Sequence, residues 1–227
     1  MQPLLNVDGG ELDDEPAELY ALADVVHVAC GGHAGDESSM DRVARACASA
    51  GTRVGAHPSY NDREGFGRRA REVAPAELET QVAEQCARLQ AVASRAGVAV
   101  VSAKPHGALY HAAHADEATA RACVAGIVQV LGTVPVVGLA GGALERAARA
   151  AGAPYQREAF ADRGVRADGS LLPRGEPGAL VEDPAVAAAR ARALSARGDV
   201  DTLCIHGDTP GALTIARAVR AALGPKQ

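Results

Sequence analysis

Tryptophan is absent from this 227-residue chain, and aromatic residues of all kinds make up only 3% of it. The core therefore has to be built from alanine, valine and leucine, whose small volumes suit close packing of helices on a sheet. An excess of basic residues is also lacking, since the net charge is -5 at pH 7. A nucleic acid is therefore not an expected partner, because binding to phosphates needs a basic surface.

Long apolar runs and targeting segments are missing as well. The longest apolar stretches fall far short of the roughly 20 residues that a membrane helix needs, and no basic region followed by an apolar stretch opens the sequence. The cysteines are scattered, with no Cys-x-x-Cys pair; they are Cys30, Cys47, Cys86, Cys123 and Cys204. Reduced, buried thiols of this kind are typical of a cytosolic protein. We therefore expect a cytoplasmic location and no contact with a membrane.

Two common catalytic signatures do not occur. The chain has no GxxxxGK[ST] phosphate loop and no Gly-x-Ser-x-Gly elbow, and no cysteine has the spacing of a nucleophile. These absences argue against covalent serine or cysteine catalysis. A metal is harder to exclude. Asp8, His33 and His57 can converge on a divalent ion, but ligands on three separate strands have no diagnostic spacing, so the sequence leaves a metal open.

The chain does contain a regular alternation of helical and strand patterns. Apolar residues at helical spacing cover 37–50, 75–96, 116–131, 142–151, 184–197 and 210–223. Short apolar strands are predicted at 4–8, 25–30, 52–56, 98–103, 134–139, 155–160 and 201–206. The short connections that follow the helices are typical of right-handed β-α-β units. We expect one α/β domain over residues 1–227, a closed or nearly closed parallel barrel, with an open doubly wound sheet as the alternative.

Nearly every predicted strand is followed at once by polar residues. A parallel barrel gathers the carboxyl ends of its strands at one mouth, so these residues face a shared pocket, which is typical of an enzyme. The candidates are Asn6, Asp8, Glu11, Gly31, Gly32, His33, His57, Lys104, His106, Gly141, Glu158, Asp162, His206 and Asp208. Two long irregular segments, 58–74 and 161–182, are expected to be functional loops at the same mouth.

The residue types indicate roles for some of these candidates. Asp8 and Glu11 are candidate bases or ligands, Lys104 can bind a carboxylate or a phosphate, and His106 can shuttle protons near neutral pH. The glycines let the backbone come close to a ligand. The remaining histidines fit no strand-end pattern and are expected to be ordinary surface or core residues: His27, His111 and His114.

Seven motifs occur in the order seen in one known family. They are Asn6–Glu11, Ala29–Asp36, Gly55–Pro58, Gly65–Arg69, Lys104–Tyr110, Glu158–Arg163 and His206–Pro210. On these motifs the chain resembles the LamB/YcsF family over nearly its whole length. The resemblance implies a distorted seven-stranded (β/α) barrel similar to the glycoside hydrolase/deacetylase barrel. It also implies ATP-dependent hydrolysis of 5-oxoproline to glutamate, in which this chain works together with partner subunits B and C.

Under the implied activity, ATP is a co-substrate that arrives with Mg2+, and no organic cofactor takes part. Lys104 and the glycine N–H groups would steady a phosphate or the substrate carboxylate, and Arg68 and Arg69 would clamp an anion. Proton transfer would fall to the strand-end imidazoles of His33, His57, His106 and His206. The acids Asp8, Glu11 and Asp208 would orient those imidazoles, act as base or hold Mg2+. Further substrate or phosphate contacts are expected from Asn6, Gly31, Gly32, Gly141, Glu158 and Asp162.

The chain departs from the family pattern beside the predicted pocket. Gly9 stands where the family usually has a larger apolar residue, Gly32 stands where it usually has an aromatic one, and the segment after Glu11 is shorter than usual. We expect this loss of bulk to widen the site.

Two other functions stay open on the sequence alone. One is a metal-dependent deacetylase or amidohydrolase on a related barrel, and the other is a non-catalytic subunit that binds a ligand. The number of copies is not fixed by the sequence either, so a homo-oligomer is possible.

Overall fold

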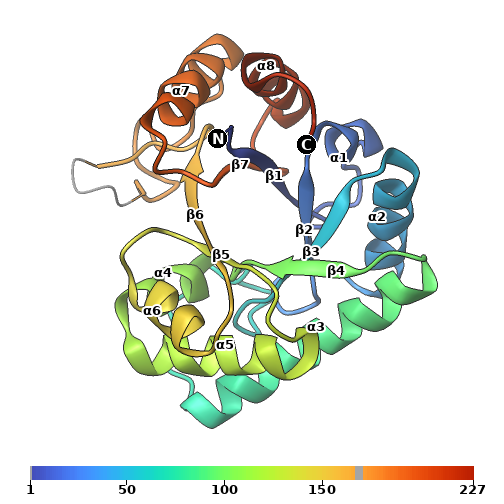
Figure 1. The fold of residues 1–227 in the computed structure, drawn as a ribbon, viewed down its shortest axis with the longest axis vertical. Helices are drawn as coiled ribbons and strands as arrows, with labels where there is room; N and C mark the ends of the chain where they lie inside the picture. The colour runs from blue at the N-terminus through green and yellow to red at the C-terminus, as the bar shows by residue number, and fades with distance from the viewer. Residues whose placement is uncertain (1, 167–170) are drawn as a thin grey trace.

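A computed structural model describes residues 2–166 and 171–227 of the protein, and within them seven parallel strands close into a barrel (Figure 1). The strands are β1 (Leu4–Gly9), β2 (Val25–Ala29), β3 (Arg53–His57), β4 (Val100–Ala103), β5 (Val136–Gly138), β6 (Tyr155–Phe160) and β7 (Thr202–His206). They follow one another around the barrel in chain order, and β7 pairs with β1 to close it. The closed barrel is therefore confirmed, and the open sheet is excluded.

Helices surround the barrel on its outer side (Figure 1). They are α1 (Ala17–Leu22), α2 (Glu37–Ala50), α3 (Pro75–Arg95), α4 (Gly107–Ala115), α5 (Glu117–Leu131), α6 (Ala143–Ala150), α7 (Pro184–Arg197) and α8 (Ala212–Leu223). Every predicted strand and helix is present, with ends displaced by two residues or fewer. The sequence did not predict α1 and α4. With six residues, α1 is too short to display a periodicity, and α4 begins inside the polar motif that follows β4.

The alternation of β1 sends its polar side chains into the barrel and its apolar ones outward. Leu5 and Val7 belong to the apolar core between the strands and the helices. Asn6 and Asp8 face inward, where they meet side chains from β6 and from the residue after β4. Parallel pairing then sets Asp8 beside His206 of β7, so the strand ends bring their polar groups to the same level.

One of the two predicted loops, 58–74, is fastened to the start of α4. Gly107 has a φ of +57°, a conformation that favours glycine, and a Cβ atom there would lie 2.5 Å from the carbonyl oxygen of Gly67. The next residue, Ala108, donates its N–H to that same carbonyl oxygen over 2.8 Å. Only glycine therefore allows the loop and the helix to approach this closely.

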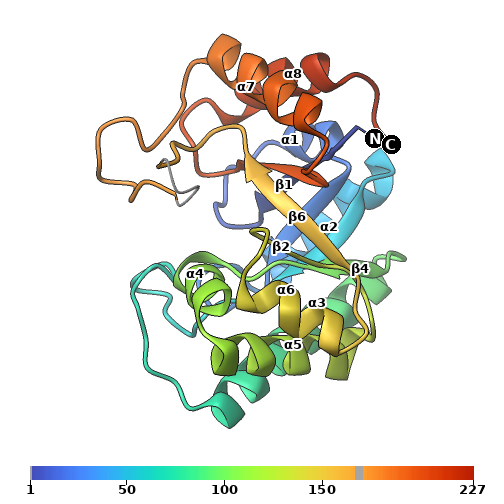
Figure 2. The same ribbon diagram turned by 60° about the vertical axis from the view of Figure 1, so that its left-hand side comes forward.

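The other predicted loop follows β6 and extends beyond the strand ends, as Figure 2 shows. Its described parts are joined by two isolated bridges, between Arg163 and Leu180 and between Val165 and Leu171. Residues 167–170 of the predicted loop 161–182 lie outside the described part of the chain. Both irregular segments are thus at the carboxyl ends of the strands, where the sequence places them.

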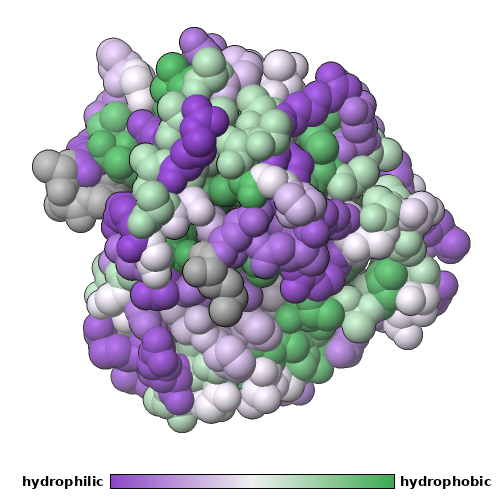
Figure 3. All heavy atoms as spheres, turned by 45° about the horizontal axis from the view of Figure 1, so that its top comes forward, coloured by the Kyte–Doolittle hydropathy of each residue, from purple (hydrophilic) through white to green (hydrophobic). Residues whose placement is uncertain are grey.

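The surface in Figure 3 has hydrophilic side chains gathered near the middle and hydrophobic ones scattered around them. Large hydrophobic residues that are exposed within the described ranges are Leu12, Val165 and Val186. In the same ranges, no helix combines the length and the apolar character required to cross a lipid bilayer.

Candidate active site

The ammonium group of Lys104 lies inside the barrel, where it meets two carboxylates. Nζ is 2.5 Å from Oδ1 of Asp8 and 3.1 Å from Oε1 of Glu158, and it donates to Oδ1 of Asn6 over 3.1 Å. Burial acts to lower the pKa of Lys104, but Asp8 and the other acidic groups around the ammonium together outweigh it and hold that pKa well above its usual value. Lys104 stays charged, and its three protons are used within the protein. These contacts do not support the expectation that Lys104 binds a phosphate or a substrate carboxylate directly.

A second buried carboxylate, that of Glu11, faces three imidazoles. Its Oε1 atom lies 2.9 Å from Nε2 of His33, 3.1 Å from Nδ1 of His106 and 3.7 Å from Nε2 of His57. The rings of His33 and His106 are stacked, with centroids 3.6 Å apart. Burial lowers the pKa of His33 to about 3 and also lowers the pKa of His106, so both rings are neutral near pH 7.

Two backbone carbonyls fix the orientation of His57 and His106. Nδ1 of His57 lies 2.7 Å from the carbonyl oxygen of Lys104, and Nε2 of His106 lies 2.9 Å from that of Phe66. Because a carbonyl oxygen can only accept a hydrogen bond, both of these nitrogens carry a proton. In the neutral form of each ring the opposite nitrogen, Nε2 of His57 or Nδ1 of His106, presents a lone pair, and these two nitrogens lie 3.1 Å from each other.

The residue that orients His106 has a strained backbone. Phe66 adopts a φ of 54° in the left-handed region, which costs about 1–2 kcal/mol for a residue with a side chain. In this conformation its carbonyl oxygen accepts from His106, while its ring packs edge-on against His33 and His106 with centroids 5.4 and 5.7 Å away. Local strain of this kind is typical of functional sites, where the surrounding structure enforces it.

His206, at the end of β7, is held by Asp162. Nδ1 of His206 lies 3.1 Å from both carboxylate oxygens, and the backbone N–H of His206 donates to Oδ2 over 2.9 Å. The hydroxyl group of Thr209 donates to the same oxygen over 2.8 Å. Burial acts to lower the pKa of His206, but the charge and hydrogen bond of Asp162, together with the charge of Asp8, outweigh it and raise that pKa above its ordinary value. His206 is therefore poised to donate a proton from Nε2.

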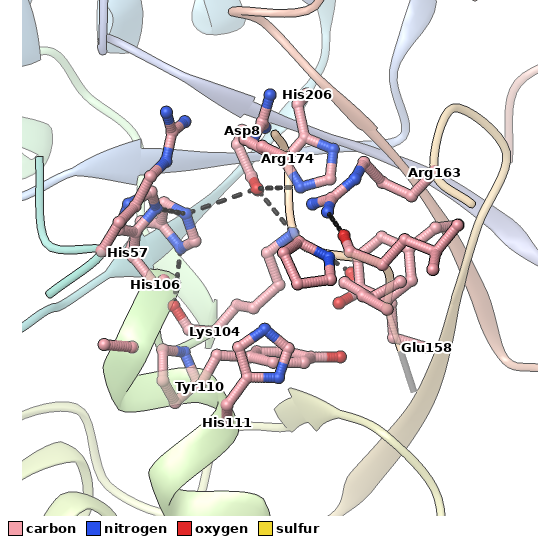
Figure 4. Close-up of a pocket in the computed structure, with 18 residues that line it drawn as sticks. Asp8, His57, Lys104, His106, Tyr110, His111, Glu158, Arg163, Arg174 and His206 are labelled. Carbon is pink, nitrogen blue, oxygen red and sulfur yellow. Dashed lines mark hydrogen bonds and ion pairs between the residues drawn. The ribbon is translucent and has the colours of Figure 1, made fainter. Parts of the chain in front are cut away.

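A cavity of about 430 Å³ opens over these groups. Figure 4 shows the residues that line it. This volume lies within the range of small-molecule binding sites. The polar side chains that line it are Asp8, His57, Lys104, His106, His111, Glu158 and His206, and the larger apolar or aromatic ones are Tyr110, Phe160, Leu171, Leu172 and Pro173. One side of the cavity is thus rich in titratable groups and the other is apolar.

Three guanidinium groups also line the cavity, and one carboxylate pairs with two of them. Arg68 and Arg174 both form ion pairs with Asp208. Arg163 donates to the carbonyl oxygen of Leu172 over 2.6 Å, and within residues 2–166 and 171–227 no carboxylate lies at ion-pair distance from it. Positive charge therefore exceeds negative charge here, so this side of the cavity suits an anion.

The structure brings most of the predicted residues together at the mouth. Asp8, His57, Arg68, Lys104, His106, Glu158 and His206 line the cavity. Asn6, Glu11, His33 and Asp162 lie behind them and hold them through the contacts given above. The catalytic roles of these residues stay predictions. Glu11, rather than Asp8, forms the compact donor cluster with His33 and His57.

Five further predicted residues do not line the cavity: Gly31, Gly32, Arg69, Gly141 and Asp208. The N–H of Gly31 donates to the carbonyl oxygen of Ala34, so it is not available to a ligand. Arg69 is exposed and pairs with Glu64. Gly141 is exposed as well, and its N–H donates to Glu145. Asp208 is engaged by the two arginines. The spacing of these residues in the sequence could not reveal such local partners.

The glycines that depart from the family pattern do not widen the site, contrary to our expectation. A Cβ atom on Gly32 would lie 2.4 Å from Oε1 of Gln85, and one on Gly9 would lie 2.9 Å from the ring of Tyr20. The space that a larger side chain would occupy is therefore filled by neighbouring side chains.

Sequence reasoning missed several residues of the site, including Arg163, which lines the cavity. Arg174 and His111 line the cavity, and Cys204 places its thiol 3.2 Å from Nζ of Lys104. The only feature of the sequence that pointed to Arg174 was its position in the irregular segment after β6, which was expected to be a functional loop. His111 lies one helical turn after Gly107 in α4, a helix that the sequence did not predict.

Comparison with known proteins gives a consistent result. The model of the LamB/YcsF family matches residues 9–227. A protein of Streptomyces avermitilis that is named as the A subunit of 5-oxoprolinase is 44% identical over 96% of this chain and 94% of its own length. The protein of the same name from Streptomyces griseus is 45% identical, with the same coverage. The crystal structure of the lactam utilization protein from Thermus thermophilus matches with a TM-score of 0.90 and 36% identity, over 98% of this chain and 96% of that one.

Proposed function

The chain belongs to the LamB/YcsF family, and on that premise we propose that it is the A subunit of a 5-oxoprolinase, which hydrolyses 5-oxoproline to glutamate with ATP. The observation that carries the proposal is the match, over nearly the whole of both chains, to proteins that bear this name. The cavity at the barrel mouth supplies the chemistry that such a reaction requires.

The substrate is a small ring with one carboxylate and one amide. Its carboxylate fits the side of the cavity where Arg68, Arg163 and Arg174 gather, because a guanidinium group binds a carboxylate through paired hydrogen bonds. Of these, Arg163 has no carboxylate partner within the described residues, because its Nε and Nη2 donate only to the carbonyl oxygens of Ala179 and Leu172. Its positive charge is therefore unmatched, whereas Arg68 and Arg174 share Asp208. The ring then lies over the titratable groups of the barrel mouth.

Hydrolysis adds water to the amide carbon, breaks the bond from that carbon to the ring nitrogen, and leaves a proton on the nitrogen. His206 is the proposed donor of that proton, because Asp162 raises the pKa of its imidazole and Nε2 is 3.9 Å from Asp8 beside the cavity. Asp8 and Lys104 form a fixed pair of charges that orients the polar groups around the ring. A positioned proton donor is worth about 100- to 10,000-fold in rate.

ATP enters the proposal as the co-substrate that activates a stable lactam. Transfer of its terminal phosphoryl group to the amide oxygen makes the carbon electrophilic, and water then releases phosphate and glutamate. Mg2+ is expected to arrive on the polyphosphate, because Asp8 is paired with Lys104 and Asp208 with two arginines. Mg2+ prefers free oxygen ligands and retains its waters.

The name that the relatives carry describes one member of an assembly. We extend the proposal to partner subunits B and C, without which turnover is not expected. The test is reconstitution of the purified chain with both partners, followed by measurement of glutamate and ADP with and without ATP. The expected result is one ADP per glutamate and a strict need for all three subunits. Glutamate release without ATP, or by this chain alone, would refute the proposal.

A matched pair of variants ties the activity to the cavity. His206→Asn should lower kcat by about 100-fold or more, because the proton donor is lost. Arg69→Gln is the control, since this exposed arginine lies outside the cavity. Equal activities of the two variants would contradict the assignment.

A further inference from the structure

We propose that Glu11, His57 and His106 form a binding site for one divalent transition-metal ion of the zinc type. The proposal stands on the geometry of these residues and does not depend on the substrate of the cavity.

The first argument is the direction of the lone pairs. The backbone carbonyls of Lys104 and Phe66 accept the N–H of His57 and of His106, so the other nitrogen of each ring points at its neighbour and toward Glu11. Nε2 of His57 also lies 3.4 Å from Oδ2 of Asp8, whose charge Lys104 already pairs. Two lone pairs and a carboxylate oxygen that face one another repel unless a cation lies between them. A hydrogen bond from a ligating imidazole to a backbone carbonyl is the usual support of metal-binding histidines.

The second argument is the spacing of the three donor atoms. The separations are 3.1 Å between the two imidazole nitrogens, 3.1 Å from Nδ1 of His106 to Oε1 of Glu11, and 3.7 Å from Nε2 of His57 to the same oxygen. Zinc binds nitrogen and oxygen at about 2.0–2.1 Å, so neighbouring ligands of a tetrahedral ion lie about 3.3 Å apart. The three atoms are therefore at the separation that a tetrahedral ion requires.

The third argument is charge. The Glu11 side chain is 1% exposed, and within the described residues only imidazole nitrogens lie at ion-pair distance from it. Its second oxygen, Oε2, is buried without a hydrogen-bond partner in the same residues. A buried carboxylate without a compensating charge is costly, and a dication at this position supplies that charge. His33, 2.9 Å from Oε1, completes the support by donating to Glu11.

A second group of candidate donors, Asp8, Cys204 and His206, also lies close together, but it does not suit a cation. The ammonium of Lys104 is 2.5 Å from Asp8 and 3.2 Å from the Cys204 sulfur, so a positive ion there would be repelled. The charge of Asp8 is already matched, whereas that of Glu11 is not.

Two imidazoles and one carboxylate form a set that suits zinc and related ions better than Mg2+ or Ca2+, which prefer oxygen ligands. Three protein ligands leave the fourth position of a tetrahedral ion open. His57 and His106 line the cavity, whereas Glu11 does not. The open position therefore faces the cavity, where water or an oxygen of the ligand can occupy it.

The test uses the full chain, stripped with a chelator and titrated with Zn2+ by calorimetry and with Co2+ by visible absorption. We expect one equivalent of each ion and a cobalt spectrum typical of nitrogen and oxygen ligands. Glu11→Gln, which keeps the size of the side chain, and His106→Ala should each weaken binding roughly 100-fold. His114→Gln is the control, because His114 lies outside the cluster and the cavity.

Circular dichroism of each variant separates a lost ligand from a lost fold. Absence of stoichiometric binding by the unmodified chain would overturn the proposal, as would unchanged affinity in a folded Glu11→Gln variant. A cobalt–thiolate charge-transfer band that disappears in Cys204→Ser would place the ion in the other group of donors and would also overturn it. None of these readouts requires turnover, so failure of the metal site is distinguishable from failure of the proposed function.

Discussion

Nζ of Lys104 and Oδ1 of Asp8 lie 2.5 Å apart inside the barrel, with both side chains 3% exposed or less. This pair joins the end of β1 to the residue after β4 across the barrel, and Glu158 of β6 adds a second carboxylate. The site is therefore built around a buried charge pair that the strands themselves position.

Removal of the ammonium should destabilise the fold strongly. Lys104→Met leaves the carboxylates of Asp8 and Glu158 buried without the ammonium charge that they share, and the expected loss is about 3–5 kcal/mol in the free energy of unfolding. Chemical denaturation with urea measures it. The double variant Lys104→Met/Asp8→Asn should recover part of the loss, because one unpaired charge is removed. A loss below about 1 kcal/mol in the single variant would contradict this account.

The pKa of His206 should depend on Asp162. Asp162 raises the pKa of His206 above its ordinary value of 6.5 against the effect of burial, so Asp162→Asn should lower it. A histidine-selective NMR titration checks this. Because the folded-state pKa is raised, the stabilisation from the pair is full below about pH 6.5 and is lost as the pH rises through the folded-state pKa. An unchanged His206 titration in Asp162→Asn would disprove the coupling.

Two glycine substitutions should differ in cost. Gly97 and Gly107 both have positive φ, but a Cβ atom on Gly97 meets nothing within 4 Å, whereas one on Gly107 lies 2.5 Å from the carbonyl oxygen of Gly67. Gly97→Ala should therefore cost only the backbone strain of about 1–2 kcal/mol, and Gly107→Ala should cost more. Thermal unfolding of the two variants side by side measures the difference. Equal costs would mean that the loop moves away without penalty.

Arg163 should determine affinity for the anionic group of the substrate. In the reconstituted assembly, Arg163→Gln should raise the KM for 5-oxoproline about 10- to 100-fold, since one charge-assisted interaction is lost. The value of kcat should change little, because the contact is equally present in the bound substrate and the transition state. Arg69→Gln is again the matched control. A fall in kcat at unchanged KM would assign Arg163 to the chemical step instead.

The sequence predicted the barrel and its mouth because both depend on local pattern. The apolar runs and helical spacings place each element, and the polar residues directly after the strands must meet once the strands are parallel. For this reason the sequence correctly places Asp8, His57, Lys104 and His206 in one pocket, although they lie at the ends of four separate strands.

Other features depend on distances that the sequence does not encode locally. That Lys104 is neutralised by Asp8 and Glu158 follows from the diameter of the closed barrel. The proton positions on His57 and His106 depend on which carbonyl oxygens lie behind them. Arg174 lies in an irregular segment without periodicity, so its place beside the cavity follows only from the ion pair with Asp208.

The segment Leu171–Arg174 forms part of the cavity lining without belonging to any strand or helix. Arg174 anchors it to Asp208, and Arg163 anchors it through the carbonyl oxygen of Leu172. Exchange of these four residues would therefore reshape the space available to a ring while the strands of the barrel stay unchanged. Evolution toward other cyclic amides could proceed here, by replacement of a short stretch of irregular chain.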